Sequence, residues 1–184
     1  MRCNVLTIAC VLATGLAAGE AGVLERGADV SSRPPWIETK WPFAFDAWPA
    51  GRAFGCAAAA CGADASVYVR PKIGFCNCSI GVADDDEIDR VGDLVLLSER
   101  YRPVGEGRPV AIGSMPGRAR AFAVESPAPR ARYAVGVAVS KRCDALVATL
   151  VSDRPISAPL ERAAFELLNR EPLVGWAEAS VGLQ

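Results

Sequence analysis

The sequence predicts an α+β domain in which a mainly antiparallel sheet is packed by a C-terminal helix and stabilised by disulfides. Three observations support this class. Apolar runs short enough for strands recur through the second half, with Gly and Pro residues that form turns between them. One later segment repeats its apolar residues at helical spacing. Five of the seven cysteines lie beyond the N-terminal segment.

Residues 1–21 are typical of a secretory signal peptide. Arg2 gives one positive charge, an apolar run follows from Val5 to Gly19, and small residues surround its end. The run is shorter than the roughly 20 residues needed to cross a bilayer. We therefore expect export to the periplasm or the extracellular space, no transmembrane segment after signal removal, and a single domain at residues 49–184.

Residues 22–48 precede this domain and are rich in proline and aromatic residues toward their end. Because prolines interrupt regular ladders, we expect an extended, irregular arm. Its large aromatic side chains either dock on the domain or form a contact surface for an apolar partner. These side chains are Trp36, Trp41, Phe43 and Trp48.

The first elements of the domain have short local signals. Residues 57–60 are four alanines and predict a helical turn, and residues 66–70 alternate as a strand that Pro71 halts. Residues 84–91 predict a short helix, because Asp84 can cap it and Glu87 follows three residues on, as in a capping box. Residues 94–97 are apolar and short enough for a strand.

The second half of the domain predicts a loop and then two hairpins. Residues 103–109 contain Pro and Gly and predict the loop, and a turn at 114–117 joins strands at 110–112 and 118–124. Two more apolar runs, 133–139 and 145–151, predict a central hairpin with Cys143 near its tip. Large valines alternate there with Ala and Gly, so we expect both faces of the hairpin to be covered.

The closing helix is predicted over Ser157 to Arg170. Leucines and alanines recur at helical spacing, Ser157 is a candidate N-cap, and Pro159 falls in the first turn. We expect this helix to pack on the sheet. Pro172 ends it, and Trp176 is expected at the edge of the core.

Composition excludes several classes of function. The formal net charge is −1, which argues against a nucleic-acid partner, because such binding needs a basic surface. The chain has no histidine, so a Ser-His-Asp or Cys-His device and a His-based metal site are excluded. Arginines between residues 100 and 142 predict either an anion-binding face or solvated strand positions, of which we favour the second.

The cysteines predict structural disulfides, because an exported chain meets an oxidising compartment. Our preferred pairing joins Cys56 to Cys61, and Cys143 to either Cys76 or Cys78. The alternative is a thiol redox or metal-binding protein that uses the cluster Cys56, Cys61, Cys76 and Cys78. Four thiolates suit structural zinc, although the spacing departs from the common paired pattern. We expect no cofactor.

The acidic run Asp84, Asp85, Asp86 and Glu87 is the other candidate contact surface. It lacks the spacing and the central Gly of a calcium loop, so helix capping explains most of it. A carboxylate enzyme is a third alternative. It requires a second acid, which the fold has to bring from elsewhere in the chain into one cleft.

Two stretches, residues 70–78 and 81–93, resemble an uncharacterised family of small exported bacterial proteins. The hairpins and closing helix of the second half are similar in pattern to PsbP-like extrinsic photosystem subunits, a similarity that implies a fold and no activity. The sequence therefore predicts a binding or accessory protein of the cell envelope rather than an enzyme. Its partner is an unidentified protein or small molecule.

Overall fold

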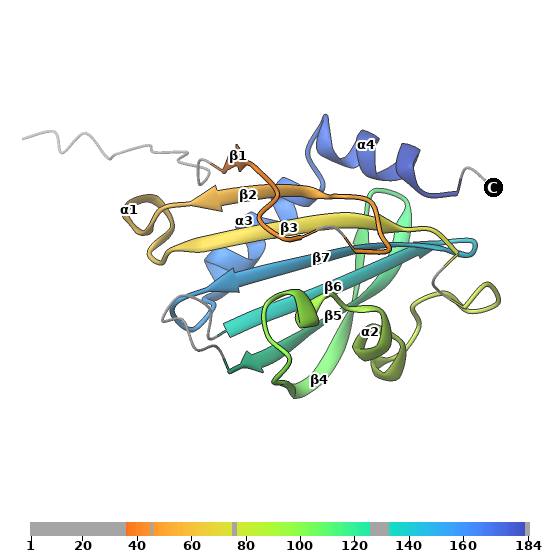
Figure 1. The fold of residues 1–184 in the computed structure, drawn as a ribbon, viewed down its shortest axis with the longest axis horizontal. Coiled ribbons are helices and arrows are strands. Elements are labelled where there is room, and N and C mark those ends of the chain that lie inside the picture. Colours follow the sequence, from red (N-terminus) through yellow and green to blue (C-terminus); the bar gives the residue numbers. More distant parts are fainter. Residues whose placement is uncertain (1–35, 45, 75–76, 126–132, 183–184) are drawn as a thin grey trace, which may run out of the picture. The chain divides into compact units, whose positions relative to one another are not determined.

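The computed structural model describes residues 36–44, 46–74, 77–125 and 133–182; the predicted signal peptide, residues 22–35 of the arm and Cys76 lie outside this range. Within it, the strands form one antiparallel sheet with two disulfides, and the α+β prediction is confirmed (Figure 1). The strands are β1 Ile37–Thr39, β2 Arg52–Cys56, β3 Ala65–Lys72, β4 Tyr101–Ile112, β5 Met115–Val124, β6 Tyr133–Lys141 and β7 Asp144–Ser152. The helices are α1 Ala58–Cys61, α2 Asp85–Val91, the 3-10 turn η1 Leu94–Leu96, α3 Ala158–Leu168 and α4 Leu173–Ser180.

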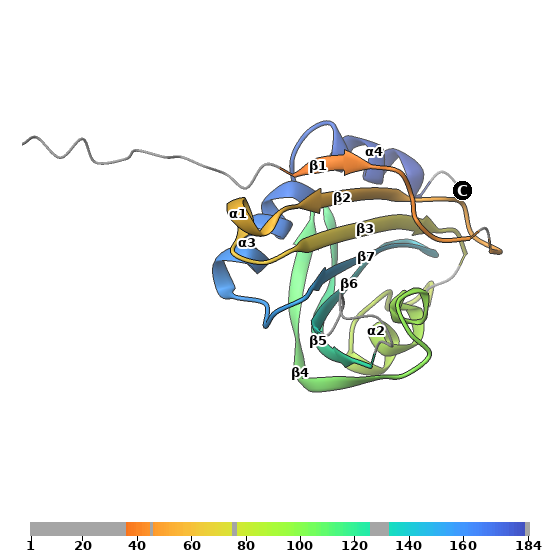
Figure 2. The same ribbon diagram turned by 60° about the vertical axis from the view of Figure 1, so that its left-hand side comes forward.

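The strand order is β1-β2-β3-β7-β6-β5-β4, so the predicted hairpin of β6 and β7 lies in the middle of the sheet. Cys143 lies in its two-residue turn, as expected. Every described residue of β7 is buried, and so is β6 except at its two ends. The prediction that both faces of this hairpin are covered is confirmed, because α2 and α3 lie on opposite faces (Figure 2).

The face with the large side chains carries the main core. Val135, Val137 and Val139 of β6 pack there with leucines of β7, and α3 and α4 cover them. The predicted start of α3 is confirmed, since the Ser157 hydroxyl accepts a hydrogen bond from the backbone N–H of Leu160. The sequence did not predict α4, whose Trp176 packs at the edge of this core.

The opposite face carries the small residues of β6, and the size of Ala138 makes room for α2. Ile88 and Val91 pack on Ala138, Ala145 and Val147. The predicted cap of α2 is confirmed, because the Asp84 carboxylate accepts a hydrogen bond of 2.9 Å from the Glu87 N–H. Leu94 at the start of η1 fills the neighbouring cluster with Phe122.

The Asp85 side chain links the first turn of α2 to β4 and β5 by hydrogen bonds. Its carboxylate accepts hydrogen bonds from the Gly107 N–H at 2.8 Å and from the Arg118 guanidinium at 2.8 Å. A Cβ on Gly107 would lie 2.4 Å from the carboxylate, so a residue without a side chain is needed at that point. The Gly107 hydrogen bond is the largest cause of a lowered Asp85 pKa, and the Arg118 charge adds to it.

We expect this carboxylate to make the fold less stable in acid. Because the folded pKa of Asp85 lies below its ordinary value of 3.8, the unfolded chain binds the proton more readily. The contribution of Asp85 to the free energy of unfolding is therefore complete above pH 3.8, and it is lost as the pH falls through the pKa of the folded state. Urea unfolding of the wild type and of Asp85→Asn at several pH values measures it. The difference in unfolding free energy should be largest at neutral pH and shrink toward pH 2; a constant difference would contradict the assignment.

Two predictions about the chain around η1 and β4 are wrong. Residues 94–97 do not form a strand, because η1 turns there to bury Leu94 and leave Val95 exposed. The predicted loop at 103–109 belongs to β4. Prolines are tolerated there because β4 is an edge strand that pairs only with β5, so a missing N–H disrupts no second ladder. The turn between β4 and β5 falls at Gly113 and Ser114, not at 114–117.

The described part of the arm is more regular than predicted. Residues 37–39 form β1, which pairs with β2 and extends the sheet at its other edge. The Trp36 indole N–H donates a hydrogen bond to the Ala163 carbonyl of α3, and its ring packs against the main core. The predicted domain boundary at residue 49 therefore divides two paired strands.

Candidate binding cleft

An open cleft of about 880 Å³ lies on the α2 side of the sheet, toward β1. Ligand sites in proteins typically measure 300 to 1,000 Å³. The floor comes from β1, β2, β3 and β7, one wall from the arm and the other from the residues at η1. The lining residues are Ile37, Thr39, Pro42, Phe43, Gly55, Cys56, Ala57, Asp64, Ala65, Ser66, Tyr68, Leu96, Leu97, Val151 and Asp153.

The small residues Gly55 and Ser66 leave the space above the floor of the cleft open. Gly55 of β2 lies opposite Ser66 of β3, and Val151 of β7 lies on the far side of Ser66. Alternate residues of a strand share a face, so Ser66 and Tyr68 both point into the cleft. A large side chain at Gly55 or Ser66 would occupy the space that the structure leaves open.

The arm forms its wall through aromatic contacts with β3. The rings of Trp41, Phe43 and Tyr68 meet edge to face, with centroids 5.2 Å apart for Trp41 and Phe43 and 4.8 Å apart for Phe43 and Tyr68. Such pairs stabilise by about 0.5 to 1.5 kcal/mol beyond the area that they bury. Gly51 permits this packing, because a Cβ there would lie 2.7 Å from the Trp41 ring.

A buried cluster of charges lies next to this aromatic group. Arg70 and Lys72 are alternate residues of β3, so they extend to the same face as Tyr68. The Arg70 guanidinium binds the Asp93 carboxylate through two hydrogen bonds of 2.7 and 2.8 Å. The Lys72 ammonium lies 2.7 Å from the same carboxylate and donates to the Val91 carbonyl at 2.9 Å. All three charged side chains are at most 6% exposed.

This cluster connects both walls of the cleft to its floor. Asp93 immediately precedes η1, whose end supplies Leu96 to one wall. Arg70 also binds Asp46 of the arm at 2.9 Å, and its guanidinium faces the Trp41 ring. The position of each wall therefore depends on the same β3 arginine.

The protonation of the cluster follows from its burial. Burial lowers the pKa of Lys72, because two cations compete for one buried carboxylate and little water reaches them. Burial by itself raises the pKa of Asp46. The hydrogen bonds from the Trp48 N–H and from Arg70 outweigh this effect, so the Asp46 pKa is lowered. The lowered Asp46 pKa keeps this carboxylate ionised, so it can bind Arg70.

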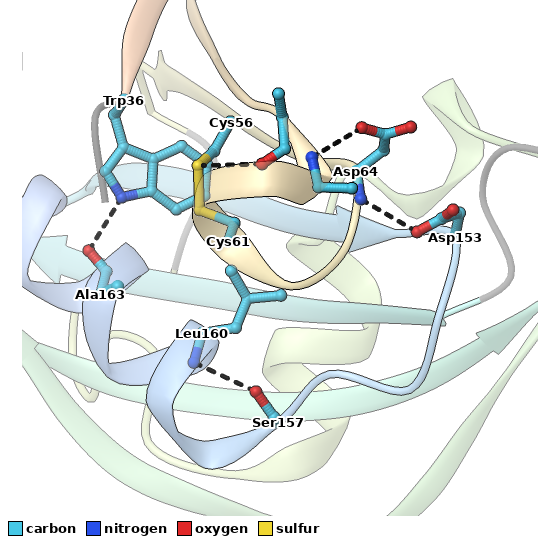
Figure 3. Close-up of a disulfide and its surroundings, with 10 residues drawn as sticks. Trp36, Cys56, Cys61, Asp64, Asp153, Ser157, Leu160 and Ala163 are labelled. Atoms are coloured by element: carbon cyan, nitrogen blue, oxygen red, sulfur yellow. Dashed lines mark hydrogen bonds between the residues drawn. A yellow bond between two sulfur atoms is a disulfide. The ribbon is translucent and has the colours of Figure 1, made fainter. Parts of the chain in front are cut away.

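Two acids occupy the end of the cleft near the Cys56–Cys61 disulfide (Figure 3). Asp64 precedes β3 and Asp153 follows β7, and these strands are paired, so the two residues lie side by side. The Asp64 carboxylate accepts a hydrogen bond from the Ala58 N–H at 3.0 Å, and the Asp153 carboxylate accepts one from the Asp64 N–H at 3.1 Å. The sequence contains no signal for this pair, because only strand pairing brings the two residues together.

The structure places the predicted contact residues in two groups. Phe43 lines the cleft and Trp41 supports it, whereas Trp36 packs on the other face of the sheet. Trp48 lies with its ring 5.8 Å from the Lys72 ammonium. A role for these four side chains in partner binding stays a prediction.

The acidic run lies on α2, away from the lining of the cleft, and several of its carboxylates bind groups of this chain. Asp84 caps the helix, Asp85 binds Arg118, and Glu87 binds Arg90 at 2.5 Å. Asp86 is exposed. The less favoured alternative for the arginines between 100 and 142, an anion-binding face, is not supported at Arg108, Arg118 and Arg120, because they pair with acids of α2 and α3. The favoured alternative, solvated strand positions, also fails at Arg118 and Arg120, whose side chains are only 20% and 16% exposed.

The disulfide pairing follows the preferred prediction. Cys56 is bonded to Cys61, and Cys78 is the partner of Cys143. The first disulfide lies near the start of β3 and the second lies beyond its end, and β3 itself is about 23 Å long at the usual rise of a strand. The structure therefore does not gather Cys56, Cys61 and Cys78 into one thiol site.

Neither a scan against protein-family models nor a search of curated proteins gives a match for this chain. Among the described residues, no group of three or more Cys, Asp or Glu side chains is arranged to hold a metal ion. In the same part of the chain, none of the helices has the length and apolar character needed to cross a membrane.

Proposed function

We propose that this chain is an exported, disulfide-bonded binding protein that holds a small molecule with a largely apolar body in the cleft between β1–β3 and η1. The cleft itself is the observation that carries the proposal, since its volume of about 880 Å³ suits a small ligand. Its lining combines apolar side chains with a few polar groups, which is usual for ligand sites. Disulfides favour an exported location, because thiols pair in oxidising compartments.

The buried cluster of Arg70, Lys72 and Asp93 supports a binding role for the cleft, because it holds the segments that form both walls. Burying two cations and a carboxylate is costly, and a cluster of this kind holds its neighbours in one arrangement. Here those neighbours are the arm and η1, so the walls stay apart without a ligand. A pre-formed site of this kind avoids the cost of ordering the protein when the ligand binds.

Binding of N-phenyl-1-naphthylamine, an uncharged apolar probe whose fluorescence rises in an apolar site, tests the proposal. We expect saturable binding by the wild type. Ser66→Trp should raise the Kd at least tenfold, because the indole fills the floor of the cleft beside Val151. The matched variant Ser66→Ala keeps the volume and should bind as the wild type does.

A second filling variant guards against a local effect at Ser66. Gly55→Leu places a side chain over the same floor, and its Cβ would meet only Thr39 Cγ2 at 3.7 Å. Thermal unfolding confirms that each variant is folded. If the wild type does not bind the probe, or if both folded filling variants bind it unchanged, the proposed function is wrong.

A further inference from the structure

The charge of the cleft is one-sided. Among its described lining residues the only charged side chains are Asp64 and Asp153, and both lie at the same end. Asp64 is exposed and Asp153 is half-buried, so water and a ligand can reach both. Within the described part of the chain, no lysine or arginine forms an ion pair with either acid. The cleft therefore offers two negative charges that the fold itself does not neutralise.

Each carboxylate is oriented by one hydrogen bond and keeps further acceptor positions. Asp64 uses Oδ1 to accept from the Ala58 N–H, and Asp153 uses Oδ1 to accept from the Asp64 N–H. An ionised carboxylate has about four acceptor sites on its two oxygens. Both groups can therefore receive a cation while they keep their bonds to the backbone.

The opposite end of the cleft is apolar. Phe43 and Tyr68 stand there in edge-to-face contact, and Leu96 and Leu97 line the facing wall. Asp64 and Tyr68 are four residues apart along β3, which corresponds to about 13 Å at the rise of a strand. A molecule that spans the cleft thus meets carboxylates at one end and an aromatic group at the other.

The basic residues nearest to the aromatic end do not reverse this polarity. Arg70 and Lys72 follow Tyr68 along β3, but both are buried and bound to Asp93. An anionic ligand in the cleft would face the two acids without a lysine or arginine among the described lining residues. A cationic ligand gains attraction at the acidic end and loses nothing at the other.

Resting on the proposed function, we propose that the ligand is an elongated amphiphilic cation. Its ammonium or guanidinium group lies against Asp64 and Asp153, and its aliphatic or aromatic body extends over Ser66 to Tyr68. The disulfide between Cys56 and Cys61 holds the acidic end in shape, because Cys56 lines the cleft and the short loop that it closes carries the Ala58 donor.

Competition against N-phenyl-1-naphthylamine at low salt tests this specificity with three decyl compounds below their micelle concentrations. These are decyltrimethylammonium, decyl sulfate and the neutral decyl maltoside. We expect decyltrimethylammonium to bind about five- to tenfold more tightly than decyl sulfate, the range set by two partly solvated ion pairs. The preference should weaken as salt is added, because the acids are accessible to solvent.

The variants Asp64→Asn and Asp153→Asn, made singly and together, locate the preference. Asparagine keeps an oxygen that accepts the backbone hydrogen bond and removes the charge. The ratio of the two dissociation constants should fall toward one in the double variant and part of the way in each single variant. Glu99→Gln removes the same charge from an exposed position outside the cleft lining and should keep the wild-type ratio.

The outcomes separate this inference from the proposed function. If the uncharged probe binds in the cleft but the cation binds no better than the sulfate, the cationic specificity is wrong and the binding function stands. The specificity is also wrong if Glu99→Gln lowers the ratio as much as the double variant does. If the uncharged probe does not bind at all, both proposals fail.

Discussion

Replacing Asp93 by alanine is expected to lower the free energy of unfolding by about 3 to 5 kcal/mol, because Arg70 and Lys72 then remain buried without their shared carboxylate. Both cations are about 95% buried or more, so water cannot take the place of the lost partner. Urea unfolding monitored by tryptophan fluorescence and by circular dichroism measures the loss. The effect on the two cations, not the removal of side-chain volume, is the reason for so large a value.

A matched control is available in the Arg52 and Glu38 pair. These side chains also form a close ion pair, at 2.6 Å, but Glu38 is half exposed. Glu38→Ala should cost at most about 1 kcal/mol, which is the usual range for a surface ion pair. Equal losses in Asp93→Ala and Glu38→Ala would show that the buried cluster contributes no more than a surface contact.

Removing the disulfide between Cys78 and Cys143 is expected to cost a similar amount. The bond joins residues 65 positions apart, so it restricts the unfolded chain strongly. Loop-closure entropy predicts a loss of about 4 kcal/mol for the double variant Cys78→Ser, Cys143→Ser. Replacing both partners avoids leaving a thiol at either position of the bond. Urea unfolding under identical non-reducing conditions measures the difference from the wild type.

The other disulfide provides the comparison. Cys56 and Cys61 are only five positions apart, so the same relation predicts a loss of about 2 kcal/mol for Cys56→Ser, Cys61→Ser. The order of the two effects tests the explanation more strictly than either value. A larger loss for the short loop would mean that local packing around Cys56, and not the entropy of the unfolded chain, determines the contribution.

Elements with a complete local signal were predicted well. Asp84 with Glu87 located the start of α2, and Ser157 with Pro159 located the start of α3. The alternation of large and small residues in the central hairpin predicted that both faces are covered, and this is confirmed. These signals work because capping and side-chain periodicity act over only a few residues.

The errors arose where tertiary contacts overrode the local signal. Residues 94–97 have the composition of a strand, but Asp93 is held by Arg70 from β3, and the chain turns to bury Leu94. Prolines in β4 indicated a loop, yet an edge strand tolerates them. Residues 37–39 were assigned to an irregular arm because nothing nearby in the sequence indicates that they pair with β2.

The sequence by itself determined the α+β class, the caps of two helices and the central hairpin, because each depends on neighbouring residues or on residue type. It left the partner of Cys143 open between Cys76 and Cys78, and the fold decided for Cys78. The cleft was decided by the tertiary structure. Asp64 meets Asp153 only through the pairing of β3 with β7, and Arg70 meets Asp46 and Asp93 only when the arm and η1 fold onto the sheet. The position of these groups depends on strand order and on packing between segments far apart in the chain, which local patterns do not encode.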